Sequence, residues 1–293
     1  GLTGGLDKSN YLTNMLLYLL LAEIIIRSVF HRRFLPVGNI PLTAFTVVAL
    51  FTVYAEAVRN GVAELIVVLG LAVILIMRES DRVHRLVVAG IASVLLVIIL
   101  VLGSFSMHKD ERWQTFIETV PIALDIEKNK AWISEGLPQP RLADGRSVDW
   151  SNYMRLARMK AGVDLTLENP WGVGFGRNAF GHAVMKKYGE SSSHSHSGLI
   201  DLAVGTGIPG TLLWIGFLVS LATLAWRSFR QTRDYCALAL LLLVTGYGTR
   251  MVLDSIIRDH MLQMFLFLAA FLAVIVASRL HGQQRETSAP ASV

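Results

Sequence analysis

Cysteine is almost absent from this chain of 293 residues, because Cys236 is the only one. A single thiol excludes a disulfide within the chain and any metal site built from several cysteines. Charge is also scarce: Asp, Glu, Lys and Arg make up 17% of the residues, whereas soluble domains carry about 25%. With 53% hydrophobic residues and a mean hydropathy of +0.50, the composition excludes an ordinary soluble domain.

Two further absences narrow the possible functions. The net charge is +5, but no stripe of basic residues alternates with aromatic residues, so the sequence does not indicate nucleic-acid binding. No pair of histidines has the i, i+4 spacing of a zinc-dependent hydrolase, and we therefore expect no metal and no cofactor. The chain also has no internal repeat of fixed period.

Long apolar blocks predict helices that cross a membrane, which requires about 20 apolar residues per helix. Seven blocks meet or approach that length: Tyr11–Ile26, Ile40–Val58, Val62–Met77, Leu86–Leu102, Gly198–Trp226, Tyr235–Leu253 and Met261–Ser278. The sequence therefore predicts an all-α polytopic membrane protein with about seven transmembrane helices. Pro209 and the glycines near it predict a kink in the long fifth block.

Arginines between the blocks predict the orientation, because short loops rich in Lys and Arg stay in the cytoplasm. Four clusters fall on one side if every block spans once: Arg27, Arg32 and Arg33; Arg78, Arg82 and Arg85; Arg227, Arg230 and Arg233; and Arg279 with Arg285. We therefore expect the C-terminus in the cytoplasm, the segment 104–197 on the opposite face, and membrane lipids as partners.

This pattern divides the chain into four parts. Residues 1–103 hold four transmembrane helices with short loops, 104–197 form a helical extracytoplasmic segment, and 198–280 hold three more spans. The polar tail 281–293 is predicted to be disordered. The chain opens with Gly1 and shows no signal peptide, so we expect it to be part of a longer protein.

The extracytoplasmic segment has helical spacing at Phe105–Lys128 and again at Trp150–Leu167, where basic and apolar residues share an amphipathic helix. Asn169–Gly176 is rich in Gly and Pro and predicts a turn that ends this helix.

His196 lies where this polar segment meets the fifth apolar block. A neutral imidazole accepts a proton near pH 7, which makes His196 a candidate general base at the membrane surface. Ser197 is placed to cap the helix that follows. The alternative is that His194 and His196 are solvated loop residues beside a serine cap.

Several arginines lie on the same side as His196. Arg59 lies at the outer end of a span, and Arg155 and Arg158 share a helix face at i, i+3. A guanidinium binds phosphate with a planar fork, so these residues are candidates for a diphosphate site. The alternative is that they snorkel to lipid headgroups, which we favour for Arg158 and Arg250 and leave open for Arg59.

A second group of polar residues, Asp254, Arg258, Asp259 and His260, forms an outer turn before the last span and is expected to be a solvated loop.

The spacing of His196-Ser197, nine residues and then Gly207-Ile-Pro-Gly210 resembles the signature of O-antigen ligases. Asn169-Pro-Trp-Gly-Val-Gly resembles the Pro-x-x-Gly-x-Gly turn of this superfamily, which also holds O-antigen polymerases and pilin oligosaccharyltransferases. The superfamily has two further elements at the heads of spans, which are resembled here by Arg59-Asn60-Gly61 and Gly5–Asn10. Arg155 stands where the amphipathic helix of the family carries an arginine.

Members of this superfamily have about a dozen spans, so the resemblance implies that this chain lacks the first few, and it implies a GT-C-like glycosyltransferase architecture. The implied activity is transfer of a glycan from undecaprenyl diphosphate to a lipid A-core sugar at the periplasmic face of the inner membrane. His196 is the implied catalytic base, and Arg59 and Arg155, with Arg158 as a weaker candidate, are the implied diphosphate ligands. Supporting residues are Ser197, Gly207, Gly210 and Asn10.

Two alternatives stay open at this point. The acceptor could instead be a growing glycan or a protein serine, which would make the chain an O-antigen polymerase or a protein O-oligosaccharyltransferase. A transporter or scaffold is the non-enzymatic alternative. Transporters place ionisable groups near the middle of the bilayer, whereas Glu23 and Glu64 here lie nearer the ends of their blocks, which favours an interfacial enzyme.

Overall fold

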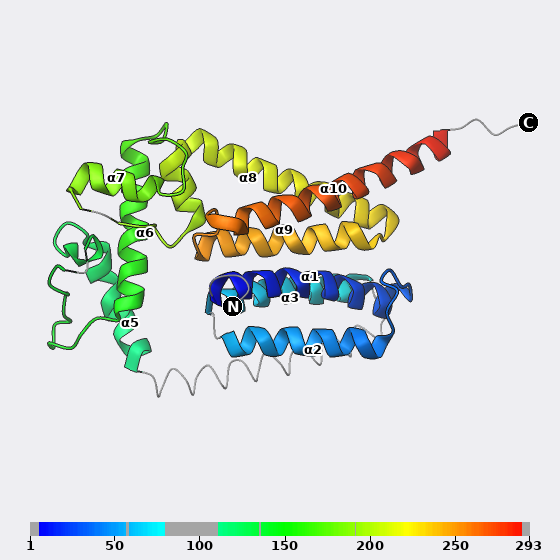
Figure 1. Ribbon diagram of the computed structural model, residues 1–293, viewed down its shortest axis with the longest axis horizontal. Coiled ribbons are helices and arrows are strands. Elements are labelled where there is room, and N and C mark those ends of the chain that lie inside the picture. The colour runs from blue at the N-terminus through cyan, green and yellow to red at the C-terminus, as the bar shows by residue number, and fades with distance from the viewer. Residues whose placement is uncertain (1–5, 57–58, 80–110, 135, 191, 289–293) are drawn as a thin grey trace, which may run out of the picture. The chain divides into compact units, whose positions relative to one another are not determined.

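The computed structural model describes residues 6–56, 59–79, 111–134, 136–190 and 192–288 (Figure 1). These residues form helices and loops, and the pairing of Arg141 with Ser147 is an isolated β-bridge. The chain divides into two compact units. Unit 1 comprises Gly1–Ala89, Ile215–Arg250 and Asp259–Val293, and unit 2 comprises Gly90–Trp214 and Met251–Arg258.

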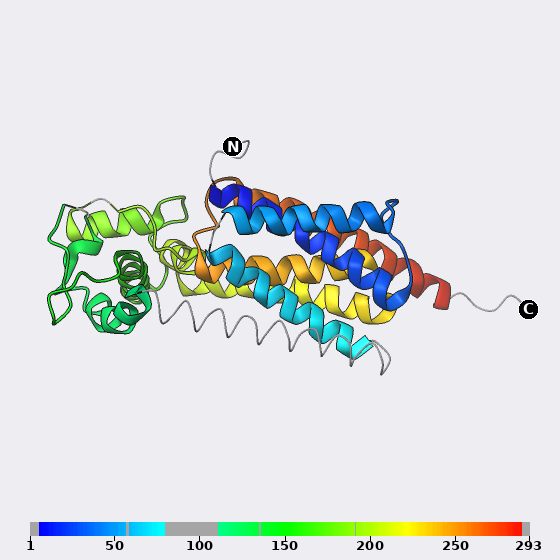
Figure 2. The same cartoon turned by 90° about the horizontal axis from the view of Figure 1, so that it is seen from below.

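Unit 1 is a set of long apolar helices that run alongside one another (Figures 1 and 2). They are α1 (Leu6–Phe30), α2 (Asn39–Glu56), α3 (Arg59–Glu79), the part of α8 (Gly198–Thr232) from Ile215 onward, α9 (Tyr235–Leu253) and α10 (Asp259–Ser288). Helix α1 packs against both α2 and α3. Many of the large apolar side chains on these helices are exposed, as expected for surfaces that face lipid rather than water.

Five helical segments of the described part of the chain are long and apolar enough to cross a membrane: Ser9–Phe30, Asn60–Glu79, Gly198–Thr232, Tyr235–Leu253 and His260–Gly282. The prediction of an all-α, multi-pass membrane protein is therefore confirmed. The second predicted block forms α2, whose apolar part is shorter, and the fourth block, Leu86–Leu102, lies outside the described residues. The count of seven spans thus stays a prediction.

The tail differs from expectation. Helix α10 continues to Ser288, so residues 281–288 are helical rather than disordered. This part of the tail simply extends the last apolar helix with polar residues that favour or tolerate a helix, such as Gln and Glu.

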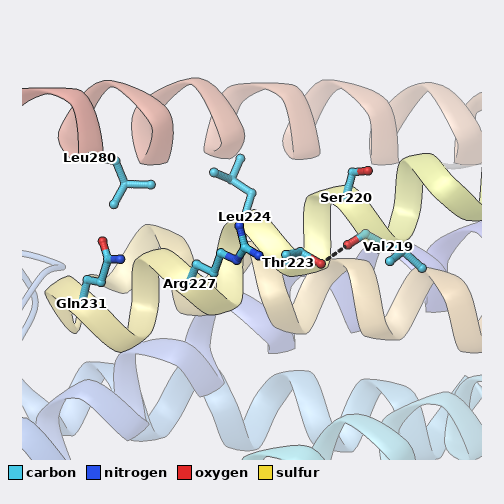
Figure 3. A pocket seen from close by; sticks show the side chains of 7 residues that line it. All are labelled: Val219, Ser220, Thr223, Leu224, Arg227, Gln231 and Leu280. Atoms are coloured by element: carbon cyan, nitrogen blue, oxygen red, sulfur yellow. Dashed lines mark hydrogen bonds between the residues drawn. The ribbon is translucent and has the colours of Figure 1, made fainter. Parts of the chain in front are cut away.

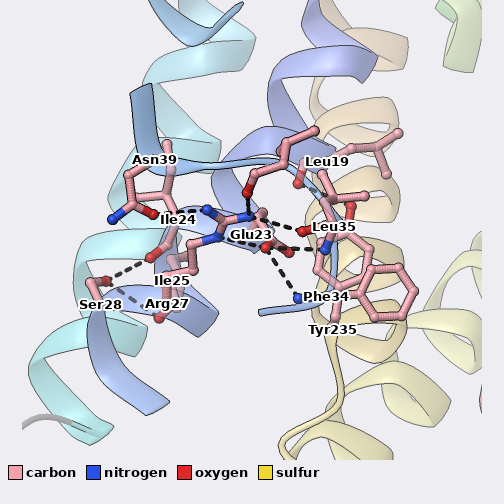
Figure 4. Close-up of polar contacts among 11 residues, drawn as sticks. Leu19, Glu23, Ile24, Ile25, Arg27, Ser28, Phe34, Leu35, Asn39 and Tyr235 are labelled. Atoms are coloured by element: carbon pink, nitrogen blue, oxygen red, sulfur yellow. Dashed lines mark hydrogen bonds and ion pairs between the residues drawn. The ribbon is translucent and has the colours of Figure 1, made fainter. Parts of the chain in front are cut away.

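The end of α1 is fixed to the loop that follows it by a buried carboxylate (Figure 4). Glu23 Oε1 accepts hydrogen bonds from Arg27 Nε at 2.7 Å and from the backbone N–H groups of Phe34 and Leu35, both at 3.2 Å. Arg27 in turn donates to Asn39 Oδ1 at 2.8 Å and to two loop carbonyls. One ion pair therefore satisfies loop groups that would otherwise be buried without partners.

The other end of α1 meets α3 and α9 through a second buried ion pair. Arg250 Nη1 donates to Glu64 Oε2 at 3.3 Å and to Asn10 Oδ1 at 3.0 Å, and the side chains of all three residues are fully buried. Asn14 Nδ2 also donates to Glu64, at 2.9 Å, as does the hydroxyl of Tyr18. The expectation that Arg250 snorkels to headgroups is therefore wrong, because its guanidinium has a carboxylate partner inside the unit.

A glycine lets these helices approach closely. A Cβ on Gly61 would lie 1.9 Å from Asn10 Oδ1 and 2.8 Å from Arg250 Nη1. Asn10 and Gly61, which the resemblance had selected as separate elements, thus belong to one polar cluster in unit 1.

Unit 2 is a helical domain with its own apolar core. It contains α5 (Glu111–Leu124), the short 3-10 helix η1 (Lys130–Trp132), α6 (Trp150–Glu168), α7 (Ala179–Tyr188) and the part of α8 up to Trp214. Buried residues from each of these helices share one cluster, among them Ala123, Trp132, Tyr153, Phe180 and Val204. The predicted amphipathic helix at Trp150–Leu167 is confirmed as α6. Of the helix predicted at Phe105–Lys128, residues 111–124 form α5, whereas residues 125–128 lie in the turn that follows it. Helix α7 was not predicted.

The buried ion pair of unit 1 gives a stability prediction. Arg250→Met leaves the Glu64 carboxylate buried without its cation, so we expect a loss of about 3–5 kcal/mol in the free energy of unfolding. The double variant Arg250→Met/Glu64→Gln removes the uncompensated charge and should recover part of that loss. Unfolding in detergent, followed by circular dichroism, measures both, and a single variant as stable as the wild type would contradict the prediction.

Candidate active site at the start of α8

A break in α8 fixes the position of the helix that follows His196. Gly207 has φ +70° and ψ −174°, a conformation open essentially only to glycine. Pro209 has no N–H to donate to the carbonyl of Gly205, and the N–H of Ile208 bonds outside the helix, to Pro170 O at 2.8 Å. The kink predicted from Pro209 and its neighbouring glycines is therefore confirmed, at Gly207.

The turn after α6 satisfies the carbonyls that the break sets free. The N–H of Val173 donates to Val204 O at 3.0 Å, and the N–H of Gly174 donates to Gly205 O at 2.9 Å. Gly172 has φ +84°, and a Cβ there would lie 2.4 Å from Gly205 O. The turn Asn169–Gly174 and the glycines after His196 are thus two halves of one backbone contact.

Gly210 supports the same region by leaving space. A Cβ on Gly210 would lie 2.4 Å from the side chain of Thr206, whose hydroxyl donates to Leu202 O at 2.8 Å.

A second close approach brings α6 to the start of α8. A Cβ on Gly162 would lie 2.2 Å from Ile200 Cγ2, so the two segments touch at this glycine. Arg158 precedes Gly162 by four residues, and His196 precedes Ile200 by four residues. The Nη1 atom of Arg158 accordingly lies 3.5 Å from Nε2 of His196.

The chain before α8 is a tight turn held by its own side chains. Ser195 N donates to Asp201 Oδ1 at 2.8 Å, Ser195 Oγ donates to Ser197 O at 2.9 Å, and Ser197 N donates to Ser195 Oγ at 3.2 Å. Ser197 Oγ also accepts from Ile200 N at 3.5 Å, which confirms its predicted role as the helix cap. Both histidines are half-buried with specific partners, so the alternative that they are solvated loop residues is wrong.

Three arginines of unit 2 surround this turn. Besides its contact with His196, Arg158 donates from Nε to Trp132 O at 3.2 Å. Arg155 lies on the same helix face, and Arg258 comes from the segment Met251–Arg258 that packs here through the bond of Gly198 N to Asp254 O at 2.9 Å. The Nε atom of Arg258 is buried and has no hydrogen-bond partner among the described residues. The expected solvated loop is therefore wrong for Arg258.

Burial, together with the positive surroundings, keeps both histidines neutral. The pKa of His196 is lowered from 6.5 to about 3, first by burial and then by the ring of His194 and the charges of Arg155, Arg158 and Arg258. Burial likewise lowers the pKa of His194 to about 4, with Arg258 as the next cause. A neutral imidazole beside several guanidinium groups is an arrangement that can bind an anion next to a group that gives up a proton.

The predicted site residues divide between the two units. His196, Ser197, Arg155, Arg158, Gly207 and Gly210 belong to unit 2, whereas Asn10 and Arg59 belong to unit 1, where Arg59 begins α3. Sequence reasoning ranked Arg158 below Arg155 and missed Arg258, because neither the crossing at Gly162 nor the packing of Met251–Arg258 is visible in a residue pattern. Among the described residues, no group of three or more His, Cys, Asp or Glu is placed to hold a metal ion.

A separate hollow of about 520 Å³ lies in unit 1 between α8 and α10 (Figure 3). Its lining residues are Val219, Ser220, Thr223, Leu224, Arg227, Gln231 and Leu280. This lining offers one cation, Arg227, but no imidazole or carboxylate that could act as a base. The chemistry of the described residues therefore favours the start of α8 as the active site.

Comparison with known families gives one match. A family model described as O-antigen ligase matches residues 44–215, which is more than half of the chain and includes Arg59, α6 and the break in α8. A search of the curated proteins found no match.

The break in α8 gives a prediction with a control in the same helix. Gly207→Ala forces a side chain into the left-handed region and places its Cβ 2.3 Å from Pro170 O, so we expect a loss of at least about 1–3 kcal/mol in stability. Gly216→Ala introduces a Cβ with nothing within 4 Å and should be neutral or slightly stabilising. Thermal unfolding in detergent compares the two variants. Equal melting midpoints would contradict the proposed role of Gly207 in the break of α8.

The neutral histidines predict acid sensitivity. Their folded pKa values of about 3 and 4 lie below the ordinary value of 6.5, so the unfolded chain binds protons first and stability falls as the pH drops below about 6.5. The melting midpoint between pH 7 and pH 5 should therefore depend less on pH in His196→Asn than in the wild type. His182→Asn, at an exposed histidine of α7, is the matched control. Identical slopes in wild type and His196→Asn would contradict the prediction.

Proposed function

The chain belongs to the O-antigen ligase family, and from this premise we propose that it transfers a glycan from undecaprenyl diphosphate to a sugar hydroxyl of lipid A-core. The reaction takes place at the periplasmic face of the bacterial inner membrane, with the C-terminus in the cytoplasm. The observation that carries the proposal is the neutral His196 beside the guanidinium groups of Arg155, Arg158 and Arg258.

The guanidinium groups explain how the site binds the diphosphate of the donor. A diphosphate has two adjacent phosphoryl groups, and planar N–H forks bind such oxygens with charge-assisted hydrogen bonds. Arg158 and Arg155 offer forks from α6, and Arg258 offers a buried Nε that has no partner among the described residues. Arg59 at the start of α3 is the further candidate that the sequence pattern supplies.

His196 explains how the acceptor hydroxyl loses its proton. An arginine donates hydrogen bonds and never accepts them, so the contact with Arg158 Nη1 assigns the lone pair to Nε2 of His196. When the diphosphate draws Arg158 away, this lone pair is available to a hydroxyl. His196 Nε2 takes the hydroxyl proton while the oxygen attacks the anomeric carbon. The bond from that carbon to the diphosphate oxygen breaks on the opposite face, which inverts the anomeric centre.

Charge balance links the two substrates. Without an anion, burial and then the charges of the nearby arginines disfavour a proton on His196 and make it a weak base. A bound diphosphate neutralises the arginine charges and so removes their part of the lowering of the His196 pKa, which makes His196 a stronger base once the donor is in place. The guanidinium groups also stabilise the negative charge that builds on the leaving diphosphate, which a metal ion would otherwise have to do.

The test is ligation in vesicles that contain the protein, a glycan on undecaprenyl diphosphate and lipid A-core. His196→Ala should lower turnover on the order of 10²–10⁴-fold, the usual contribution of a general base. Arg146→Gln, at an exposed arginine of unit 2 that pairs with Asp144, should retain activity. Activity should also persist in excess chelator. Normal turnover by His196→Ala would exclude the proposed base.

The same vesicles separate the roles of the arginines and the possible acceptors. Replacing Arg158, Arg258 or Arg59 by Lys keeps the charge but removes the fork, so the donor KM should rise. An unchanged donor KM for one of them would remove that residue from the diphosphate site. Growth of glycan on the carrier lipid, or transfer to a protein serine, would identify a polymerase or a protein O-oligosaccharyltransferase instead.

A further inference from the structure

His194 is the residue of the site that the proposed chemistry does not use. Its Nδ1 atom lies 3.2 Å from the backbone nitrogen of His196 and 3.2 Å from Ser255 Oγ. A backbone N–H only donates, so Nδ1 of His194 must carry a lone pair. This contact assigns the neutral form of His194 with its proton on Nε2.

The backbone that His194 holds is strained. His196 has φ +66°, in the left-handed region that side chains other than glycine rarely adopt. Such a conformation is strained and persists only where surrounding contacts impose it. The bond from His196 N–H to His194 Nδ1 is one such contact, and the Ser195 and Asp201 bonds described above hold the residues on either side.

The two rings also contact each other. Their centroids are 4.3 Å apart at an angle of 71°, an edge-to-face arrangement. His194 therefore restrains His196 twice, through its backbone nitrogen and through its ring.

We propose that His194 is a positioning residue: its Nδ1 lone pair holds His196 in the left-handed conformation that points the His196 imidazole toward Arg158 and the reacting hydroxyl. This inference rests on the proposed function for its catalytic consequence, but the contact itself does not. Charged groups that face the pair from neighbouring segments are Asp201, Asp254, Arg155, Arg158 and Arg258.

The experiment uses substitutions that differ in where they place an acceptor. In His194→Asn the amide Oδ1 can take the place of Nδ1, whereas in His194→Gln the acceptor lies one bond farther out, nearer the place of Nε2. His194→Phe keeps a ring against His196 but has no acceptor. His182→Asn is again the matched control at an exposed histidine.

We expect His194→Asn to keep near wild-type kcat in the vesicle ligation assay. His194→Phe and His194→Gln should lower kcat by up to the order of 10²-fold, as a base displaced by about 1 Å does, while the donor KM stays unchanged. Asn and Phe variants with equal kcat, whether both active or both inactive, would overturn the proposal.

A second measurement is independent of activity. Diethyl pyrocarbonate modifies an accessible imidazole nitrogen, so mass spectrometry of His196 reports how it is held. The rate of His196 modification in His194→Phe should differ from the wild-type rate. In His194→Asn it should return to the wild-type rate. If His196→Ala ligates normally while this pattern holds, the proposed function fails and the positioning role stands. If the modification rate is the same in all variants, the positioning role fails.

Discussion

Unit 2 and its site depend on one backbone exchange, made where α8 breaks at Gly207. A broken helix leaves carbonyls and N–H groups without partners, and inside a bilayer or an apolar core each such group costs several kcal/mol. Here the turn after α6 supplies three bonds at the break: Val173 and Gly174 donate to carbonyls of the first half of α8, and Ile208 donates to the carbonyl of Pro170. Because the exchange fixes α8 to the end of α6, the start of α8 has a defined place beside Arg158.

The second constraint is electrostatic. Like charges that gather without a counterion repel one another, and a protein keeps them together only where packing and hydrogen bonds compensate. In unit 2 the compensation for Arg158 includes the carbonyl of Trp132 and a neutral imidazole. In unit 1 the charge of Arg250 is instead compensated by a carboxylate, because its guanidinium forms a buried ion pair with Glu64. The contrast distinguishes Arg250, whose charge is paired inside unit 1, from the arginines that we propose bind the donor diphosphate.

Much of this could be read from the sequence. Long apolar blocks, an amphipathic pattern and a Gly/Pro cluster predicted the helical membrane fold, α6 and the kink of α8, because each is a local consequence of composition and spacing. What failed was long-range: Arg250 was expected at the lipid surface and Arg258 in solvent. Arg250 has its carboxylate partner Glu64 186 residues away in the chain, and Arg258 lies near His194 and His196, which are also distant in the chain. Periodicity does not encode such contacts. Arg158 was underrated for the same reason, since only the crossing at Gly162 brings it to His196.

The central claim is that the neutral His196 and the arginines beside it form the site of glycan transfer. The measurement that tests it most directly is an electron cryomicroscopy map of the protein with a non-transferable analogue of the lipid-linked glycan diphosphate. We expect the two phosphoryl groups to contact Arg158 and Arg258, with the anomeric carbon turned toward Nε2 of His196. An analogue bound with its diphosphate elsewhere, and the start of α8 left without it, would contradict the claim.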